Sequence, residues 1–158
     1  MIRVLFVCHG NICRSPMAEA VFHHMVQTAG LVDEFYIDSA GISGWHQGER
    51  AHNGTLDVLR RNGILYNGRS RQVNVSDVDG FDYLLVMDRS NFVDMNRMLG
   101  RVESKVKMFL SYAKQEGLVE VTEVPDPYYT GGFDEIYDLV WRGCAALLGQ
   151  IRDEYGLD

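Results

Sequence analysis

The sequence predicts a single-domain α/β fold: a doubly wound, four-stranded parallel sheet with helices on both faces. Short β-favouring runs alternate along the chain with stretches of helical spacing, which is typical of such sheets. The first run, residues 2–7, is almost continuously apolar, as expected of a strand that is buried on both faces. A chain of 158 residues with 46% hydrophobic residues suits one compact core, so we expect residues 1–158 to form one domain.

Each predicted element has its own local signal. Runs of β-favouring residues predict strands at residues 2–7, 35–38, 82–87 and 105–110. Apolar stripes predict a first helix that ends at Gly30, a short helix around residues 56–59 that is closed by Gly63, a helix over 90–99 and a long helix over 133–155. In the first helix, Ser15 is the predicted N-cap and Pro16 takes the first helical position.

Charge and cysteine content narrow the classes of function. A net charge of −7 disfavours binding to nucleic acid or to a membrane surface, because both need clustered Lys and Arg. The apolar run is cut short at residues 8–11, so it predicts neither a signal peptide nor a membrane span. Three cysteines in such a chain predict free thiols in a reducing compartment. We therefore expect a cytoplasmic protein. If it binds a phosphate group, a few neighbouring residues should hold it, not an extended basic surface.

The chemistry concentrates in residues 8–16, which connect the first strand to the first helix. Successive backbone N–H groups in such a turn can converge on an anion, and the positive end of the helix dipole points to the same place. Gly10 and Asn11 suit the positive φ angles that this curvature requires. Ser39 and Asp88 also fall at the carboxyl ends of strands, where doubly wound sheets bind their ligands.

Cys8 is the predicted nucleophile of this segment. The loop amides, the helix dipole and Arg14 all favour an ionised sulfur, so we expect a thiolate at neutral pH. The planar guanidinium of Arg14 matches two phosphate oxygens, and the hydroxyl of Ser15 can donate to the sulfur. The alternative is a buried structural cysteine, because a Cys-x5-Arg spacing alone also arises by chance.

A thiolate that displaces an aryl oxygen from phosphorus needs an acid to protonate the leaving group. Asp126 is the predicted proton donor. It lies between Pro125 and Pro127, which stiffen the turn, and the rings of Tyr128 and Tyr129 can wall a slot for a phenyl group. The alternative is an Asx turn beside two solvent-exposed tyrosines.

These motifs resemble those of the low-molecular-weight protein tyrosine phosphatases. The two long matches are Val4-Leu5-Phe6-Val7-Cys8-His9-Gly10-Asn11-Ile12-Cys13-Arg14-Ser15-Pro16 and Asp126-Pro127-Tyr128-Tyr129. Shorter matches follow in the family's order: Asp38-Ser39-Ala40-Gly41, Trp45, Arg71-Gln72 and the run 81–91. The resemblance therefore covers nearly the whole chain.

The resemblance implies hydrolysis of phosphotyrosine in proteins, or of small aryl phosphate monoesters, through a phosphocysteine intermediate on Cys8. It implies Arg14 as the phosphate clamp, Asp126 as acid and then base, inorganic phosphate as product, and neither a cofactor nor a metal. The implied phosphate-binding loop adds His9, Gly10, Asn11, Ile12, Cys13 and Ser15. Asn11, Ser15 and Ser39 would hold this loop in shape, and Trp45, His46, Tyr128 and Tyr129 would form the rim that selects substrate.

Four further positions carry separate expectations. Gly68 departs from the family, whose members often have a histidine there that supports the loop. His9 varies in the family, and we expect it to face solvent. Cys13 is close enough to Cys8 for a reversible protective disulfide, which the resemblance supports; the alternative is a small buried side chain. Cys144 lies on the apolar stripe of the last helix, where core packing is expected.

Two rival functions remain at this point. A thiol-dependent arsenate reductase shares the fold and loop but needs further relay cysteines, and none lies near residues 80–90. A non-catalytic phosphate-binding module would need neither Asp126 nor a reactive thiol. His23 and His24 do not predict a metal site, because adjacent helix positions diverge and no third ligand is suitably spaced.

Overall fold

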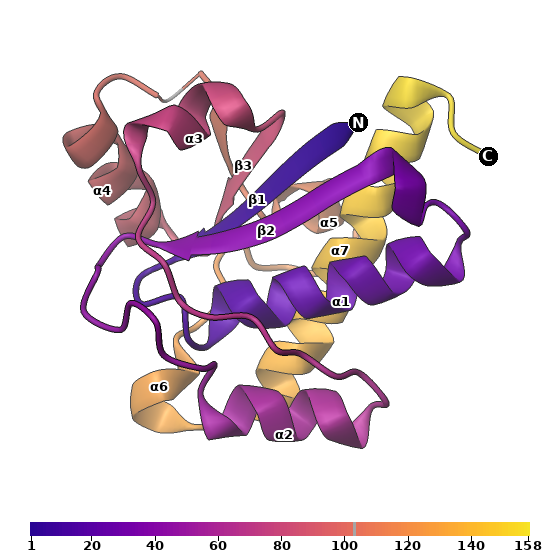
Figure 1. The fold of residues 1–158 in the computed structure, drawn as a ribbon. Helices are drawn as coiled ribbons and strands as arrows, with labels where there is room; N and C mark the ends of the chain where they lie inside the picture. The colour runs from indigo at the N-terminus through magenta and orange to yellow at the C-terminus, as the bar shows by residue number, and fades with distance from the viewer. Residues whose placement is uncertain (103) are drawn as a thin grey trace.

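The computed structural model describes residues 1–102 and 104–158 and confirms the predicted α/β fold (Figure 1). Its four strands are β1 (Ile2–Cys8), β2 (Phe35–Gly41), β3 (Tyr83–Val86) and β4 (Val106–Met108). They form one all-parallel sheet in the order β2-β1-β3-β4. The inner strand β1 pairs on both sides, with Val4 opposite Ile37 of β2 and Tyr83 of β3. The sequence predicted this strand as buried on both faces, and that is confirmed.

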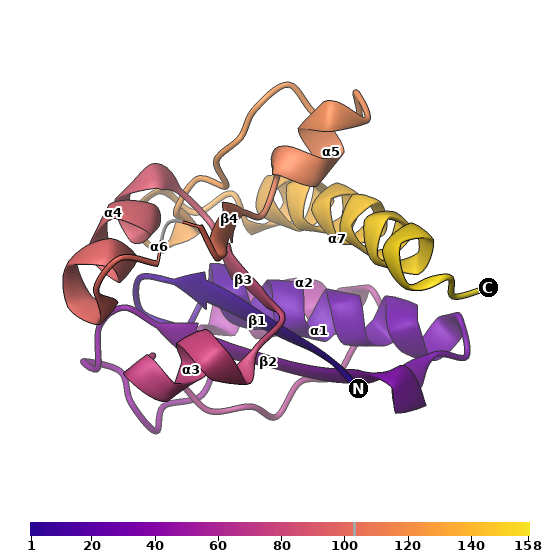
Figure 2. The same cartoon turned by 90° about the horizontal axis from the view of Figure 1, so that it is seen from above.

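Helices cover both faces of the sheet (Figures 1 and 2). They are α1 (Arg14–Thr28), the 3-10 turn η1 (Val32–Glu34), α2 (Asn53–Arg61), α3 (Val75–Gly80), α4 (Arg89–Leu99), α5 (Ser111–Gln115), α6 (Pro127–Thr130) and α7 (Phe133–Tyr155). One buried apolar cluster joins the sheet to α1, α2 and α7, and the other joins it to α3 and α4. Both chain termini lie at the end of the sheet opposite to the carboxyl ends of the strands (Figures 1 and 2).

The alternation of side chains along β1 feeds both cores. Phe6 points into the larger cluster, where its ring meets Phe22 edge-on at 5.7 Å and Phe109 at 5.5 Å. Leu5 and Val7 point to the other face and belong to the second cluster. With both faces buried, the strand holds its last residue, Cys8, at a fixed point on the edge where the other strands also end.

Three expectations about elements need correction. Helix α1 begins at Arg14 rather than after Ser15, and Cys13 is its N-cap without a side-chain hydrogen bond. The last strand ends at Met108, because the chain turns after it into α5. The short helices α3, α5 and α6 were not predicted, although a capping box formed by Asn74 and Asp77 marks the start of α3.

None of the helices in residues 1–102 and 104–158 combines the length and the apolar character that a membrane crossing requires.

Candidate active site

The loop between β1 and α1 is shaped by Asn11. This residue has a φ of 56°, in the left-handed region, as the sequence predicted. Its Nδ2 donates to Ser15 Oγ at 2.8 Å and to Ser39 Oγ at 3.0 Å, and its Oδ1 accepts from the Arg71 backbone N–H at 3.0 Å. Gly10 was predicted to share the positive φ and does not; a side chain there would instead crowd the ring of His46. The amide of Asn11 therefore ties the loop to two other segments of the chain.

Cys8 lies at the bottom of this loop with its sulfur almost fully buried. Its Sγ is 3.0 Å from Ser15 Oγ. Because Ser15 Oγ already accepts a hydrogen bond from Asn11, its own proton is free to point at the sulfur or at the Ala40 carbonyl, which is 3.4 Å away. The hydroxyl of Ser15 thus serves the sulfur and not the helix end, which explains why it is not the N-cap.

Arg14 is buried, with 2% of its side chain exposed, and it is anchored on one edge of its guanidinium. Nη1 donates to Asp88 Oδ2 at 2.6 Å and to the Val124 carbonyl at 2.9 Å. Burial lowers the pKa of Arg14. The sulfur of Cys8 and the carboxylate of Asp88 together raise it by more, so the net shift is upward. Nε is buried and has no hydrogen-bond partner within the described residues. The Nε edge therefore remains available to bind an oxyanion.

Asp126 reaches the same place from the far end of the chain. It is the N-cap of α6, where its Oδ1 accepts from the Tyr128 backbone N–H at 3.0 Å. Its Oδ2 lies 3.5 Å from Arg14 Nη2, and a third of its side chain is exposed. The Asx turn and the site carboxylate, which the sequence left as alternatives, are both present: the turn fixes one oxygen and leaves the other beside the arginine.

These groups surround one cavity of about 220 Å³. Its lining consists of Cys8, His9, Gly10, Ile12, Cys13, Arg14, Ser43, Trp45, His46, Asp126, Tyr128 and Tyr129. Asn11, within the loop, bonds to Ser15 and Ser39 behind it, and these bonds support the loop. His9, which we expected to face solvent, is exposed and also lines the cavity. The structure thus brings together every predicted site residue, either in the wall or directly behind it.

Comparisons with known proteins agree with this geometry. The family model described as low molecular weight phosphotyrosine protein phosphatase matches residues 3–156. The chain belongs to this family. It is 47% identical over 156 residues to the low molecular weight protein-tyrosine-phosphatase YfkJ of Bacillus subtilis, covering 98% of each chain. It is also 47% identical over 140 residues to a low molecular weight phosphotyrosine protein phosphatase of Schizosaccharomyces pombe, covering 86% of this chain and 88% of the other.

Solved structures of relatives share the whole fold of this phosphatase. The crystal structure of YfkJ superposes with a TM-score of 0.92 and covers 98% of this chain and 96% of the other. The structure of a Drosophila arginine phosphatase, 31% identical, superposes with a TM-score of 0.85 and covers 96% of this chain and 98% of the other.

The rim of the phosphatase cavity is aromatic. The rings of Tyr128 and Tyr129 meet edge-on at 5.0 Å, and His46 approaches Tyr128 with ring centroids 6.2 Å apart. Trp45 and Tyr129 are 84% and 82% exposed, so their faces are open to a ligand. His46 is held by Glu49, whose oxygens lie 3.1 Å from Nδ1. The predicted rim residues therefore form a slot with apolar walls above the sulfur.

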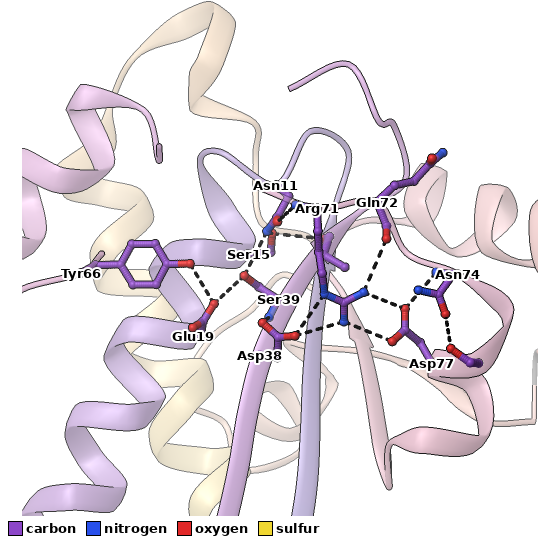
Figure 3. Close-up of polar contacts among 12 residues, drawn as sticks. Asn11, Ser15, Glu19, Asp38, Ser39, Tyr66, Arg71, Gln72, Asn74 and Asp77 are labelled. Atoms are coloured by element: carbon purple, nitrogen blue, oxygen red, sulfur yellow. Dashed lines mark hydrogen bonds and ion pairs between the residues drawn. The ribbon is translucent and has the colours of Figure 1, made fainter. Parts of the chain in front are cut away.

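A chain of hydrogen bonds continues from the loop into the protein (Figure 3). Ser39 Oγ donates to Glu19 Oε1 at 2.6 Å, and the hydroxyl of Tyr66 donates to the same oxygen at 2.9 Å. Burial raises the pKa of Glu19 to about 7, although its bonds to Ser39 and Tyr66 act in the opposite direction. Burial, followed by the charge of Glu19, also raises the pKa of Tyr66.

These hydrogen bonds explain why position 68, where the family often has a histidine according to the resemblance, can be a glycine. A Cβ built on Gly68 would lie 2.1 Å from the hydroxyl oxygen of Tyr66, so the tyrosine occupies the space that a side chain at 68 would need. In this phosphatase Tyr66 bonds to Glu19, which in turn holds Ser39 and through it Asn11. The loop is therefore supported from Tyr66, and Gly68 has no side chain that could take part.

Arg71 supports the loop from the other side (Figure 3). Its guanidinium bonds to Asp38 at 3.1 Å and to Asp77 at 3.0 Å, while its backbone N–H holds Asn11. The carboxylate of Asp77 also caps α3 by accepting from the Asn74 backbone N–H at 2.8 Å. The start of α3 and the loop between β1 and α1 are thus held by the same residue, Arg71.

The remaining cysteines and histidines occupy the following places. Cys13 is buried, burial raises its pKa to about 12, and it lines the same cavity as Cys8; all three thiols are free. Cys144 is buried in the larger core, as predicted, and its Sγ lies 3.6 Å from the Ala18 carbonyl. Residues 1–102 and 104–158 contain no group of three or more His, Cys, Asp or Glu side chains arranged to hold a metal ion, and His23 and His24 belong to no such group.

Sequence reasoning missed several contributors. Asp88 was placed at a strand end but was not recognised as the anchor of Arg14, a role its position could have suggested. The Val124 carbonyl carried no signal, because every residue has a carbonyl. Glu19 and Tyr66 were also missed, since no local pattern connects residues so far apart in sequence.

Proposed function

We propose that this protein hydrolyses phosphotyrosine in proteins and small aryl phosphate monoesters by transferring the phosphoryl group to Cys8. The observation that carries the proposal is the Nε of Arg14, a buried N–H donor without a partner in the described residues, on a side chain that lines the same cavity as Cys8. Such a donor is costly unless a ligand completes it, and a phosphate oxygen is the matching acceptor. The names of the relatives support the same substrate class.

In the first step the Cys8 thiolate attacks phosphorus, so that an S–P bond forms while the P–O bond to the aryl group breaks. Arg14 Nε and Nη2, together with the loop N–H groups, stabilise the charge on the three equatorial oxygens. Asp126 Oδ2 gives its proton to the departing phenolate. The ion pair of Arg14 with Asp88 keeps the guanidinium in place, because it uses the opposite edge of the group.

In the second step a water molecule loses its proton to Asp126 and attacks phosphorus, and the S–P bond breaks. The hydroxyl of Ser15, 3.0 Å from the sulfur, donates to the leaving thiolate and makes it a better leaving group. Inorganic phosphate departs, and Cys8 and Asp126 return to their starting protonation states. The cycle uses only groups of this chain and water.

The rim selects the substrate in this proposal. The open faces of Trp45 and Tyr129 and the ring of Tyr128 offer apolar contact to a phenyl group whose phosphate reaches the sulfur. We infer that an alkyl phosphate such as phosphoserine is too short to place its phosphate on the loop while its backbone rests on the rim. We therefore expect a strong preference for phosphotyrosine over phosphoserine.

A substrate panel tests the proposal. Phosphate release is measured from p-nitrophenyl phosphate and from phosphotyrosine, phosphoserine and phosphoarginine peptides, with and without chelator, on the wild type and the Cys8→Ser variant. Phosphoarginine is included because one related structure is that of an arginine phosphatase. Turnover of the aryl phosphates that disappears in Cys8→Ser supports the proposal. Turnover that survives in Cys8→Ser, or phosphate binding without any turnover, refutes it and favours a binding module.

A further inference from the structure

A second groove opens directly beside the catalytic cavity. Its walls include Arg50, His52 and Arg69, and it shares Ile12, His46 and Tyr128 with the cavity. We propose that this groove, here called the arginine groove, binds an acidic side chain that flanks the phosphotyrosine of a protein substrate. The inference rests on the proposed function and adds a selectivity for sequence around the phosphorylated residue.

Arg50 and Arg69 face one another across a backbone bridge. They are partners in an isolated antiparallel pair, and the neighbouring Ser70 N–H donates to the Glu49 carbonyl at 2.8 Å. Residues directly opposite in such a pair point to the same face with their Cβ atoms about 5 Å apart, and like charges there repel. An anion held between the two guanidinium groups would remove this repulsion.

No carboxylate in the described part of the chain fills that role. Among residues 1–102 and 104–158, no Asp or Glu oxygen lies within 4.0 Å of either guanidinium, and Arg69 Nη1 instead donates to the Gly48 carbonyl at 3.5 Å. Glu49 also lines the groove and is adjacent to Arg50 in sequence, but its carboxylate lies 3.1 Å from His46 Nδ1. Some other exposed arginines do have such a partner: Arg61 pairs with Asp134 at 3.0 Å.

A carboxylate from a substrate fits these two arginines better than other anions do. A guanidinium offers a planar pair of donors that matches the two oxygens of a carboxylate. The groove adjoins the cavity through the rim residues His46 and Tyr128, so both can be occupied at once by one extended chain. At about 3.3 Å per residue, an extended peptide places residues one to three positions from the phosphotyrosine within roughly 10 Å of it. With a net charge of −7, the protein as a whole repels acidic peptides, so any preference for them must be local.

The test compares two phosphotyrosine peptides that differ only in having Glu or Gln at the three positions on each side of the phosphotyrosine. Their kcat/KM values are measured for the wild type, for Arg50→Gln/Arg69→Gln, and for Arg97→Gln/Arg142→Gln, which removes the same charge from exposed arginines outside both cavities. Each rate is divided by that for p-nitrophenyl phosphate, which has no flanking residues. We expect the wild type and the control to prefer the Glu peptide by about fivefold. Arg50→Gln/Arg69→Gln should use the two peptides about equally. The preference should shrink as salt is raised, because the arginines are exposed.

Equal rates for the two peptides in the wild type, or the same preference in all three proteins, would overturn the inference. Binding of the labelled peptides by fluorescence anisotropy, with each protein carrying Cys8→Ser, separates it from the proposed function. A Glu preference in binding without any turnover in the parent proteins would refute the catalytic proposal and leave the groove standing. Turnover of p-nitrophenyl phosphate without a Glu preference would support the catalytic proposal and overturn the inference about the arginine groove.

Discussion

Replacement of Glu19 by Gln should remove a pH-dependent loss of stability. Glu19 is largely buried, and its pKa in the folded protein is about 7 against an ordinary value of 4.5, with burial as the main cause. A carboxyl group with a raised folded-state pKa binds its proton more tightly in the folded than in the unfolded chain. Its contribution to stability is therefore complete below about pH 4.5 and is lost as the pH rises through about 7.

The magnitude follows from these two values. A tenfold change in the ionisation constant corresponds to about 1.4 kcal/mol, so the full effect is about 3 kcal/mol, of which about 2.5 kcal/mol falls between pH 5 and pH 8. A glutamine resembles the protonated acid, because its carbonyl oxygen can still accept from Ser39 and Tyr66. The free energy of unfolding of Glu19→Gln should lack this part of the pH dependence.

Urea unfolding followed by far-UV circular dichroism at pH 5, 6, 7 and 8 measures the effect. Every other ionisable side chain is common to both proteins, so the difference between wild type and Glu19→Gln isolates residue 19. Glu116→Gln, at an exposed glutamate, is the matched control and should follow the wild type. If the stabilities of wild type and Glu19→Gln stay parallel across this range, Glu19 is not titrating there and the reasoning fails.

Four further results are expected. Arg14→Lys should lower kcat for p-nitrophenyl phosphate by about 100-fold or more, because a lysine lacks the planar fork; near-normal turnover would contradict the clamp. Asp126→Asn should lower kcat by about 100-fold for aryl phosphates with poor leaving groups and less for good ones; a loss independent of leaving-group pKa would exclude the acid role. Mild peroxide should produce a Cys8–Cys13 disulfide detectable by mass spectrometry, whereas sulfinic acid on Cys8 would count against it. Gly143→Ala should destabilise the protein by about 1–3 kcal/mol in urea unfolding, because its Cβ would lie 2.5 Å from Phe109, whereas Gly149→Ala on the same helix has open space and should not destabilise it.

Local sequence patterns predicted the sheet and the longer helices because their apolar periodicity is set by burial within a few residues. The inner strand β1 and the long helix α7 show this well, since each carries its core face in its own sequence. The short helices α3, α5 and α6 have too few residues for a period. They are recognised by their ends, such as the Asp126-Pro127 start of α6, which looked like a turn.

The site divides in the same way. Two sequence motifs that can be recognised without a structure contain Cys8, Arg14 and Asp126. The structure places all three residues at one cavity. The role of Ser15 was half predicted: its contact with the sulfur is present, but the helix cap is not. Glu19 and Tyr66, 47 positions apart, meet only after the chain folds, so no window of sequence could connect them.

The preset shape of the loop at Asn11 has a consequence for how the protein behaves among anions. Because the loop is held by hydrogen bonds to Ser39 and Arg71 before any ligand binds, it needs no rearrangement to accept a tetrahedral oxyanion. If the loop binds phosphate as proposed, an ester and free orthophosphate would present similar oxygens to the same donors. We therefore expect orthophosphate to compete with substrate for this loop, and turnover to fall when the phosphate concentration is high.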